Sequence, residues 1–437
     1  MSHEPTAAVL IGLLFPKSTF LTDPLVYPPL GLWYLAAQLE AQGHRTEFRD
    51  MSVDMLPADG EFDQLWISAT SPQMHEARRL AAETRHWEKT VTVFGGSAPW
   101  ARPDECAQLG FDLVVAGEAD HPATVAHIVD QAERVRWHGP GGVLRPAITP
   151  GPLTWALPPV RRWDGQYHAW LEDRAGVRHR TTTMFGSRGC PMACAFCESG
   201  RNGVIWDRAV RYEPLALIEA QLREIRDRGH TGVMFYDDIL PLAKRRTLGV
   251  MAQLKQYSLI WRCFLRTDVI IQQGGYEYLA AMAEAGLVEV LAGVESADNR
   301  IKANIHKGTT IEQDTQVLRW CQQLGIKFKA SLILGLPGED RESLERTREW
   351  ILRERPDRVD VNALIPFPGT PIADRKTDYN GVEFDVRWET ELPETFWYKG
   401  QRDACNSIVS TSSLTAAEIG AFHDALVKEI IEANIPY

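Results

Sequence analysis

No apolar run in this sequence reaches the roughly 18 residues that a membrane-spanning helix requires. The N-terminus has no basic segment followed by an apolar one, so no signal peptide is expected. Cysteine is scarce, with seven in 437 residues, and four of these are isolated: Cys106, Cys263, Cys321 and Cys405. Scattered cysteines are typical of a reducing compartment. These absences predict a cytoplasmic protein that does not span a membrane.

An excess of positive charge is also missing. The chain has 47 Lys and Arg against 58 Asp and Glu, which gives a net charge of −11. A nucleic-acid partner needs a basic surface that neutralises phosphates, so this balance argues against one. It suits a neutral or cationic small substrate instead. Repeats and low-complexity tracts are absent, and the length predicts two or three domains.

Three cysteines do lie close together. Cys190, Cys194 and Cys197 have the spacing C-x₃-C-x₂-C, with Gly189 in front and Phe196 before the last of them. Closely spaced thiolates hold iron–sulfur clusters, and these three match three irons of a [4Fe–4S] cube. The fourth iron would then keep an open position, as catalytic zinc does. A zinc loop is the alternative, but zinc usually needs a second ligand pair, and none stands nearby.

Residues 1–138 are predicted to form a doubly wound α/β domain. A continuous apolar run predicts a strand buried on both faces over residues 8–14, and further strands are predicted over residues 45–50, 65–68, 91–94 and 113–116. Apolar residues recur at helical spacing from Leu32 to Leu39, and Gly43 stands where a helix C-cap glycine belongs. Strands that alternate with helices indicate a parallel sheet of the Rossmann type.

Small and polar residues follow three of these strands, at the edge where such sheets bind ligands. Glycines there let a ligand approach the backbone closely. For any one of them taken alone, a plain strand-to-helix turn is the favoured interpretation. The predicted set is Ser68, Thr70, Gly95, Gly96, Gly117 and Glu118.

Residues 180–375 repeat the alternation and are predicted to form a second domain. The expected strands are residues 181–186, 232–237, 261–266, 288–292, 327–334 and 359–365. Six βα units are fewer than the eight of a closed barrel, so a partial (β/α)₆ barrel is expected. The first strand delivers the cysteine loop at its carboxyl end, where the active sites of such barrels lie.

Two further segments are predicted outside these domains. Residues 139–179 are rich in Pro and Gly, which predicts a linker without regular structure. Residues 376–437 form a C-terminal extension with Trp388, Trp397 and Tyr398, and helical spacing over residues 416–434 predicts a helix that packs on the barrel.

Polar residues also follow the barrel strands. Asp237 and Asp238 are adjacent carboxylates at a strand end and are poor core residues. Tyr236 is a candidate proton relay, with packing as the alternative. The Arg266 guanidinium can pair with a carboxylate in a fork geometry. Glu295, Ser296, Gly335 and Gly338 complete the set of candidate residues at strand ends.

The cysteine loop resembles the signature of the radical S-adenosylmethionine (SAM) superfamily. This resemblance implies that the free iron binds the amino and carboxylate groups of SAM, and that SAM cleavage gives a 5′-deoxyadenosyl radical that abstracts hydrogen. It places Asp237 and Asp238 near the SAM amino group and Glu295 near its ribose or methionyl part. It also implies cofactor-binding roles for Phe196, Arg266, Ser296, Gly335 and Gly338.

The first domain resembles the cobalamin-binding domain of one large branch of this superfamily. The similar segments are Pro29-Leu30-Gly31-Leu32, the Gly95-Gly96 turn and Val115-Ala116-Gly117-Glu118. In that branch the corrinoid tail lies along the Gly-Gly side of the sheet. The motif D-x-H-x-x-G, which supplies an axial histidine in corrinoid mutases, is missing. A bound cobalamin would therefore lack that ligand, or the domain binds no corrinoid.

Two reactions on a small molecule are compatible with these features, and both would take electrons from a donor such as flavodoxin or ferredoxin. The first is cobalamin-dependent C-methylation of a natural product, for which the N-terminal domain argues. The second is radical dehydration or deoxygenation of a diol without corrinoid, as in aminoglycoside biosynthesis, which suits an acidic chain and a cationic amino sugar. A tRNA methylthiotransferase would need a second cysteine set, which is missing.

Overall fold

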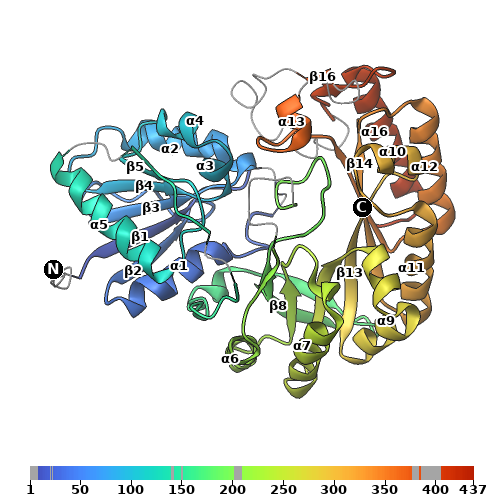
Figure 1. Ribbon diagram of the computed structural model, residues 1–437, viewed down its shortest axis with the longest axis horizontal. Coiled ribbons are helices and arrows are strands. Elements are labelled where there is room, and N and C mark those ends of the chain that lie inside the picture. Colours follow the sequence, from blue (N-terminus) through green and yellow to red (C-terminus); the bar gives the residue numbers. More distant parts are fainter. Residues whose placement is uncertain are drawn as a thin grey trace. The chain divides into compact units, whose positions relative to one another are not determined.

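The computed structural model describes residues 8–19, 21, 23–138, 142–148, 151–200, 209–375, 383–384 and 405–437 (Figure 1). The chain divides into two compact units, with Tyr167 in the first and His168 at the start of the second. The three aromatic residues expected to mark the C-terminal extension, Trp388, Trp397 and Tyr398, lie outside the described residues.

The first unit is a doubly wound α/β domain, as predicted. Its sheet has the order β2-β1-β3-β4-β5-β6 with all pairs parallel. The order reverses between β1 and β3, which is the topological switch point where such sheets bind ligands. The strands are β1 Leu10–Phe15, β2 Arg45–Asp50, β3 Gln64–Ser68, β4 Val91–Gly95, β5 Leu113–Val115 and β6 Gly142–Leu144.

Helices cover both faces of this sheet (Figure 1). One face buries an apolar cluster shared with α2, α3 and α4, in which Leu80, Ala98 and Cys106 are fully buried. On the other face α1 and α5 contact each other. The helices are α1 Leu30–Ala41, α2 Met74–Thr84, α3 Ser97–Ala101, α4 Pro103–Ala107 and α5 Pro122–His138, with a 3₁₀ turn η1 at Ser71–Gln73.

The predicted linker is more regular than expected. Residues 142–144 form β6 and pair with β5 in parallel, so the sheet has one more strand than the sequence indicated. Further along, Trp163 packs on Trp33 and Phe48 with ring centroids 6.4 and 5.3 Å apart. Proline cannot donate a backbone hydrogen bond in a sheet, but residues 142–144 include no proline and can therefore pair as a short strand. The expected absence of regular structure is therefore wrong for residues 142–144 and for residues 170–172, which also form a strand.

The second unit is the predicted partial barrel. Its sheet has the order β15-β14-β13-β12-β11-β8-β7, in which β8 to β15 are parallel and β7 pairs with β8 in antiparallel fashion. The strands are β7 Trp170–Glu172, β8 Arg178–Met184, β11 Gly232–Phe235, β12 Ile260–Leu265, β13 Leu287–Glu295, β14 Lys327–Leu334 and β15 Arg358–Ala363.

Helices lie along the outer side of this curled sheet (Figure 1). The helices of the second unit are α6 Leu215–Asp227, α7 Lys244–Gln256, α8 Thr267–Gln273, α9 Gly275–Glu284, α10 Asn299–Asn304, α11 Ile311–Leu324, α12 Arg341–Glu354, α13 Pro371–Arg375 and α16 Ala416–Glu432, of which α13 lies apart from the outer row. There are also two 3₁₀ turns, η2 Asp164–Gln166 in the first unit and η3 Leu240–Leu242 in the second. Short two-residue strands pair as β9 Ser187–Arg188 with β10 Arg211–Tyr212, and as β16 Glu383–Phe384 with β17 Val409–Ser410.

The two faces of the barrel sheet differ in chemistry because side chains alternate along each strand. Trp261 and Cys263 of β12 belong to the apolar core that the helices cover. Arg262 projects from the opposite, inner face, where its Nη1 lies 3.0 Å from Glu289 Oε1 of β13. The inner face is therefore polar.

The strand β7, which the sequence placed in the linker, closes one end of the barrel. It contacts β12 and β13 besides its partner β8. Glu172 of β7 also pairs with Lys327 at the start of β14, with 2.8 Å between Oε1 and Nζ. The hairpin of β7 and β8 thus crosses the N-terminal ends of the strands and shields the inner face from that side.

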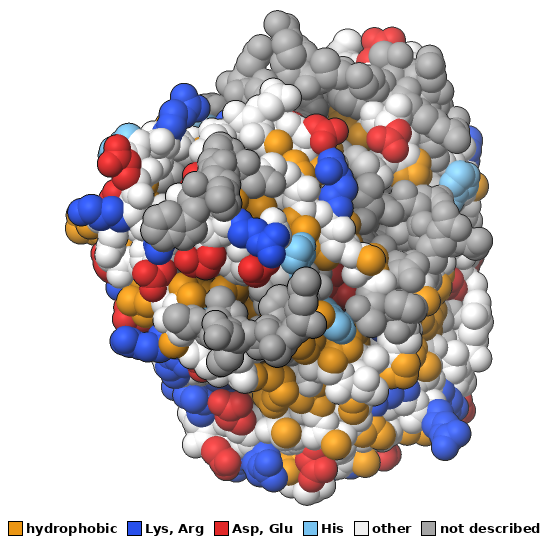
Figure 2. Space-filling model, turned by 60° about the vertical axis from the view of Figure 1, so that its left-hand side comes forward, with side chains coloured by type: hydrophobic (Ala, Val, Ile, Leu, Met, Phe, Trp, Pro, Cys, Tyr) orange, Lys and Arg blue, Asp and Glu red, His pale blue; other side chains and the backbone are white. Residues whose placement is uncertain are grey.

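The surface mixes both signs of charge. Figure 2 shows Lys and Arg side chains interspersed with Asp and Glu on the face that it draws. Pairs such as Arg79 with Glu83, 2.7 Å apart on α2, are of this kind. Among the helices described, none is long and apolar enough to cross a membrane.

The contact of Tyr167 with the first unit can be tested. Its hydroxyl donates to Asp50 Oδ2 at 2.7 Å, and both side chains are almost fully buried. Tyr167→Phe leaves that oxygen without its donor, which should lower the free energy of unfolding by about 1–3 kcal/mol. Urea unfolding followed by tryptophan fluorescence measures the change.

The matched control is Tyr257→Phe, because the Tyr257 hydroxyl makes only a long contact of 3.4 Å with Glu219 in a half-buried setting. Equal stabilities for the two variants would show that residues around Tyr167 do not hold the first unit together.

Candidate active site

The cysteine loop follows β8 and β9 at the carboxyl end of the barrel strands. Cys190 and Cys194 are buried and Cys197 is half-buried. The loop is fixed in the middle, because Ala195 N donates to Ile305 O at 2.9 Å and Ala195 O accepts from Ile372 N at 3.2 Å. The loop that the sequence predicted as the centre of the protein therefore connects the ends of α10 and α13.

The three thiols share one environment. Burial, together with the nearby Asp238 and Cys194, raises the pKa of Cys190 to about 11. Burial, together with Cys194, Asp238 and Cys190, raises the pKa of Cys197 to about 12. Each thiol is thus close enough to feel the charge of another.

This donor set fits a cluster better than a single ion. Within the described ranges, no three His, Cys, Asp or Glu side chains converge as ligands of one metal ion. A cube is different, because each thiolate binds a different iron and the sulfurs then lie further apart. Arg266 stands beside the loop, with its Nη1 3.6 Å from Cys194 Sγ. A cation there offsets the negative charge that the thiolates of a cluster carry.

Arg266 follows β12 and is buried at 7% exposure. Its fork is engaged within the protein, because Nε and Nη2 donate to the two carboxylate oxygens of Asp268 at 3.1 and 2.9 Å. Its Nη2 also donates to Lys307 O at 2.5 Å. Pairing of Arg266 with the SAM carboxylate remains a prediction, and in this structure Asp268 occupies the fork.

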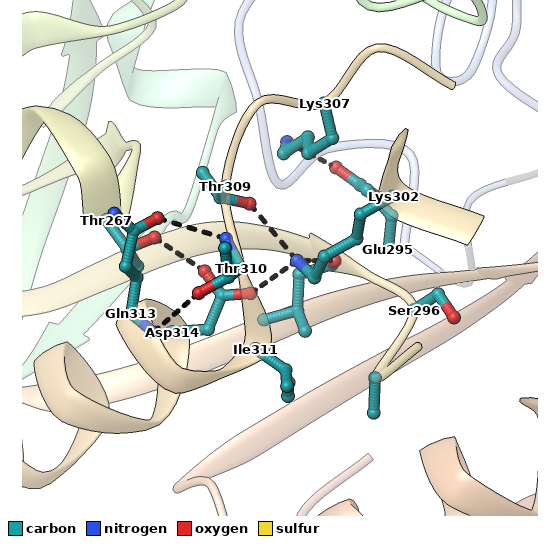
Figure 3. Close-up of polar contacts among 12 residues, drawn as sticks. Thr267, Glu295, Ser296, Lys302, Lys307, Thr309, Thr310, Ile311, Gln313 and Asp314 are labelled. Atoms are coloured by element: carbon teal, nitrogen blue, oxygen red, sulfur yellow. Dashed lines mark hydrogen bonds and ion pairs between the residues drawn. The ribbon is translucent and has the colours of Figure 1, made fainter. Parts of the chain in front are cut away.

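Glu295 ends β13 and faces a second buried cation. Its Oε1 accepts from Lys307 Nζ at 2.7 Å, and both side chains are less than 10% exposed (Figure 3). Burial alone would lower the pKa of Lys307, but the charges of Glu295 and Cys194 outweigh it and the pKa is raised. Lys307 therefore stays an ammonium.

The backbone is shaped around this pair. Glu295 has φ +64, a left-handed conformation that costs energy for a residue with a side chain. Gly293 leaves the space that the pair fills, since a Cβ there would lie 2.2 Å from Glu295 Oε1 and 2.7 Å from Lys307 Nζ. The register between β13 and β14 also shifts between Gly293 and Glu295.

Ser296 does not share this position. Its side chain is fully buried, its Oγ lies 3.5 Å from Thr347 Oγ1 on α12, and it accepts from Asp298 N at 3.2 Å. Figure 3 shows it apart from Glu295 and Lys307. The structure thus brings Arg266, Glu295 and the cysteine loop together and places Ser296 in the packing of α12.

The carboxylates after β11 brace the two ends of the cysteine loop. Asp237 is buried and accepts from Gly186 N at 2.7 Å and from Ser187 Oγ at 2.5 Å. Burial raises its pKa to about 7. Burial also raises the pKa of Asp238 to about 6, against hydrogen bonds from Ser199 and from Gly189 N. Contact of either carboxylate with the SAM amino group remains a prediction.

Tyr236 stands at the same strand end and is half-buried. Its ring meets Phe264 in an edge-to-face arrangement with centroids 6.1 Å apart. Phe196, the aromatic residue of the cysteine loop, lies with its ring centroid 6.0 Å from Lys307 Nζ. Of the two aromatic residues that the sequence predicted for the site, Tyr236 thus meets a residue near the end of β12 and Phe196 lies near Lys307 in the loop after α10.

The turn after β14 is organised by a buried carboxyl group. Gly335 and Gly338 have φ +87 and +79, as a tight turn requires. Glu339 Oε2 accepts from Gly335 N at 2.5 Å and from Leu336 N at 3.3 Å. A Cβ on Gly335 would lie 2.7 Å from Val409 of β17. Part of the glycine requirement is thus packing within the chain.

The candidate edge of the first unit is formed by neighbouring strand ends. Ser68 and Gly95 are register partners of β3 and β4. Gly96 has φ +104, and a Cβ there would lie 2.4 Å from Ala69 O, so only glycine fits. A Cβ on Gly95 would meet only Val115 at 4.0 Å. The strand end therefore leaves open space above Gly95.

The other three predicted residues of this edge have roles within the chain as well. Thr70 is exposed and forms a capping box with Gln73 at the start of η1. Gly117 approaches Pro146, whose carbonyl oxygen would lie 2.8 Å from a Cβ on that glycine. Glu118 is 5% exposed at the end of β5. All six residues thus follow three adjacent strands, β3, β4 and β5.

Some residues of the site were not predicted from the sequence. Lys307, Asp268 and Gly293 were not among the candidate residues. Their importance comes from burial and pairing, which no local pattern reveals. The one available signal was charge next to a strand end, as for Asp268, which stands two positions after Arg266 at the end of β12.

Comparison with known proteins agrees with this architecture. The profile of the radical SAM superfamily matches residues 184–351, and that of the B12 binding domain matches residues 17–126. The chain therefore carries a radical SAM domain and a B12 binding domain. A radical SAM domain implies a [4Fe–4S] cluster and SAM as cofactors.

Two curated relatives and one solved structure illustrate the similarity. An uncharacterized methyltransferase of Pyrococcus horikoshii is 27% identical, covering 78% of this chain and 77% of its own length. The anaerobic magnesium-protoporphyrin IX monomethyl ester cyclase of Rubrivivax gelatinosus is 24% identical, covering 78% of this chain and 65% of its own length. The chain thus spans about two thirds of that enzyme.

The radical SAM methyltransferase TsrM of Kitasatospora setae, with cobalamin and a [4Fe–4S] cluster bound, has the same fold. Its TM-score is 0.66 at 16% identity, with 87% of this chain and 81% of TsrM covered. At this identity the likeness establishes the fold and nothing finer.

The buried carboxyl of Glu339 predicts a pH dependence of stability. Burial raises its pKa to about 8, from 4.5 in the unfolded chain. Between those values the folded chain binds more protons than the unfolded one, so the free energy of unfolding falls as pH rises from about 4.5 to about 8. Glu339→Gln cannot ionise, and it should become more stable relative to the wild type across this window. Thermal unfolding at several pH values measures this.

The control is Glu349→Gln, the same chemical change at an exposed position of α12. A stability difference between Glu339→Gln and wild type that stays constant with pH would contradict the raised pKa.

Proposed function

We propose that this protein is a cobalamin-dependent radical SAM methyltransferase that alkylates an unactivated carbon of a small molecule. The observation that carries the proposal is the combination of two ligand edges in one chain. One is the cysteine loop at the carboxyl end of the barrel strands, and the other is the open glycine edge above Gly95 in the B12 binding domain.

Cys190, Cys194 and Cys197 would hold the cluster, and their common environment beside Arg266 supports this. A [4Fe–4S] cluster supplies one electron to SAM, whose cleavage yields a radical that removes hydrogen from the substrate. The protein's part is electrostatic. Arg266 and Lys307 are buried cations next to Cys194, and they stabilise thiolates that burial alone would protonate.

Glu295 is proposed to bind the hydroxyl groups of the SAM ribose. Lys307 Nζ donates to one oxygen of this carboxylate at 2.7 Å and fixes its orientation, and carboxylate oxygens accept hydrogen bonds from hydroxyl groups. Asp238 bonds both flanks of the cysteine loop and is proposed to lie near the SAM amino group. Gly335 and Gly338 allow a tight turn after β14, and the adenine ring of SAM is proposed to lie beside this turn.

Ser68, Thr70, Gly95, Gly96, Gly117 and Glu118 are proposed to line the cobalamin site. Cobalamin supplies the methyl group when it is bound. Glycine at residue 96 brings the ends of β3 and β4 together, and glycine at residue 95 leaves the backbone open to a large ligand. With no D-x-H-x-x-G motif in the chain, the cobalamin is proposed to bind without an axial histidine.

The comparisons support methyl transfer to a small molecule. The Pyrococcus horikoshii relative is named as a methyltransferase, and a second TsrM structure holds a tryptophan substrate and a SAM analogue. The inner face of the barrel is polar, with Lys329 and Asp360 paired at 2.8 Å. A polar natural product, such as an amino sugar, suits this face. A flavodoxin or ferredoxin is proposed as the electron donor. Radical dehydration of a diol without corrinoid is the alternative, and the acidic chain and the missing D-x-H-x-x-G motif are the arguments for it.

Cluster binding is the first prediction of this proposal. Anaerobic reconstitution of the wild type with iron and sulfide should give a brown protein with about four irons per chain. Cys190→Ala should lose most of this iron and its visible absorption, because the cube loses one of its three protein ligands. Iron analysis and the visible spectrum are the measurements.

Cys106→Ala is the matched control, since Cys106 is equally buried but lies in the core of the first unit. Unchanged iron in Cys190→Ala would show that the predicted loop is not the site of the cluster.

Cobalamin binding gives a separate prediction. Gly95 has no positive φ and has space around it, so Gly95→Leu can be accommodated without backbone strain. Its side chain would fill the open edge of β4 and should reduce the uptake of hydroxocobalamin at least tenfold, which corresponds to about 1.4 kcal/mol. Gel filtration with detection of the corrinoid absorption measures uptake.

Gly31→Leu is the control, because nothing lies within 4 Å of a Cβ on Gly31 in α1. Stoichiometric cobalamin on Gly95→Leu would contradict the proposed site, while a corrinoid-free wild type would exclude cobalamin-dependent methylation altogether.

A further inference from the structure

A second buried lysine lies behind the site. Lys302, in the last turn of α10, is 1% exposed and its three N–H groups are all used (Figure 3). Its Nζ donates to Val294 O at 2.6 Å, to Thr309 Oγ1 at 3.1 Å and to Asp314 Oδ2 at 2.5 Å. The network is closed, since Thr267 Oγ1 donates to the other oxygen of Asp314 at 2.5 Å.

Each partner in this network neighbours a residue of the candidate site. Val294 directly precedes Glu295, and Thr309 follows Lys307 by two positions. The backbone of Lys302 adds a link, because its carbonyl accepts from Lys307 N at 2.9 Å. One ammonium therefore bonds to the strand end that carries Glu295 and to the loop that carries Lys307.

The third link runs through Asp314 to α8. Thr267, which donates to Asp314, directly follows Arg266. Arg266 in turn reaches Cys194 Sγ and the backbone carbonyl of Lys307. The segments bearing the three charged side chains around the site thus converge on the pair of Lys302 and Asp314.

We propose that Lys302 is a positioning residue for the SAM site: with Asp314 it fixes the segments that carry Glu295, Lys307 and Arg266. The inference rests on the proposed function, because it takes those three side chains to surround SAM and the cluster. Lys302 has no path to a ligand of its own, since its donors are all engaged within the chain. It acts through the left-handed Glu295 and the loop of Lys307, whose conformations need support from their surroundings.

If Lys302 only stabilises the fold, a variant that regains stability should also bind SAM normally. A double variant of Lys302 and Asp314 separates this structural role from positioning of the SAM site. Removing one member of a buried ion pair leaves an unpaired charge, so Lys302→Met and Asp314→Leu should each lower the melting temperature. Combining them replaces the pair by apolar side chains of similar size, which buried sites often tolerate. The double variant should therefore regain most of the wild-type melting temperature.

The measurement is equilibrium dialysis of radiolabelled SAM against the anaerobically reconstituted full chain, with the EPR spectrum of the reduced cluster in the presence of SAM. If Lys302 positions the site, the double variant melts near the wild type but binds SAM at least about tenfold more weakly. Its EPR spectrum with SAM should also differ from that of the wild type. A double variant with wild-type SAM affinity and spectrum would overturn the inference.

A milder substitution keeps the test open should the double variant not fold. Thr309→Val removes one acceptor of Lys302 and no charge, and it should weaken SAM binding severalfold. Thr315→Val is its matched control on α11, because the Thr315 hydroxyl bonds to Ile311 O and Trp350 Nε1 instead. Equal SAM affinities for these two variants would likewise count against positioning. A wild type that takes up a cluster but no SAM overturns the proposed function, whereas normal binding by the variants overturns only the role of Lys302.

Discussion

Buried charge has to be paired, and the candidate active site is built around that constraint. Arg266, Lys307 and Lys302 are each less than 10% exposed, and each meets a carboxylate: Asp268, Glu295 and Asp314. An unpaired ion at such depth costs several kcal/mol, so these contacts fix the backbone as firmly as apolar packing does. These three ion pairs fix the loop of residues 305–310 and the ends of β12 and β13. The cysteine loop then rests on this frame through Arg266 and Ile305.

The parallel strands were predictable because they are buried on both faces. Such strands appear in the sequence as short continuous apolar runs, as β1 does, and the strands β2 and β14 have the predicted bounds. The strands β6 and β7 were missed for the opposite reason. Each is three residues long at a sheet edge, within a stretch rich in Pro and Gly, and each gains its conformation from its neighbour rather than from its own sequence. Predicted β13 was too short, because the strand continues through Gly293 to the polar Glu295.

In the candidate site, too, features set by local sequence could be predicted and features set by distant contacts could not. The spacing of Cys190, Cys194 and Cys197 is local, so the sequence alone indicates a cluster loop, and the strand ends bring Glu295 and Arg266 toward it as expected. The partners of those residues are distant in sequence: Lys307 lies 12 positions from Glu295 and 41 from Arg266. Pairings at such separations are set by the fold, and only the structure identifies them. The same holds for Ser296, which local position suggested for the site but which packs toward Thr347.

The polar inner face of the barrel follows from the demands of radical chemistry. A radical that abstracts hydrogen from an unactivated carbon reacts with whatever is nearest, so water and mobile side chains have to be kept away. The hairpin of β7 and β8 covers the N-terminal ends of the strands, and the ion pair of Glu172 with Lys327 attaches it to β14. Inside, Arg262 and Glu289 satisfy each other and so present no free charge. Under the proposed function, a face of this kind would orient a polar substrate by hydrogen bonds from groups that are already fixed. The positions of the groups that would contact the substrate are then fixed before it binds. Buried ion pairs favour this preorganisation because they hold side chains in one conformation.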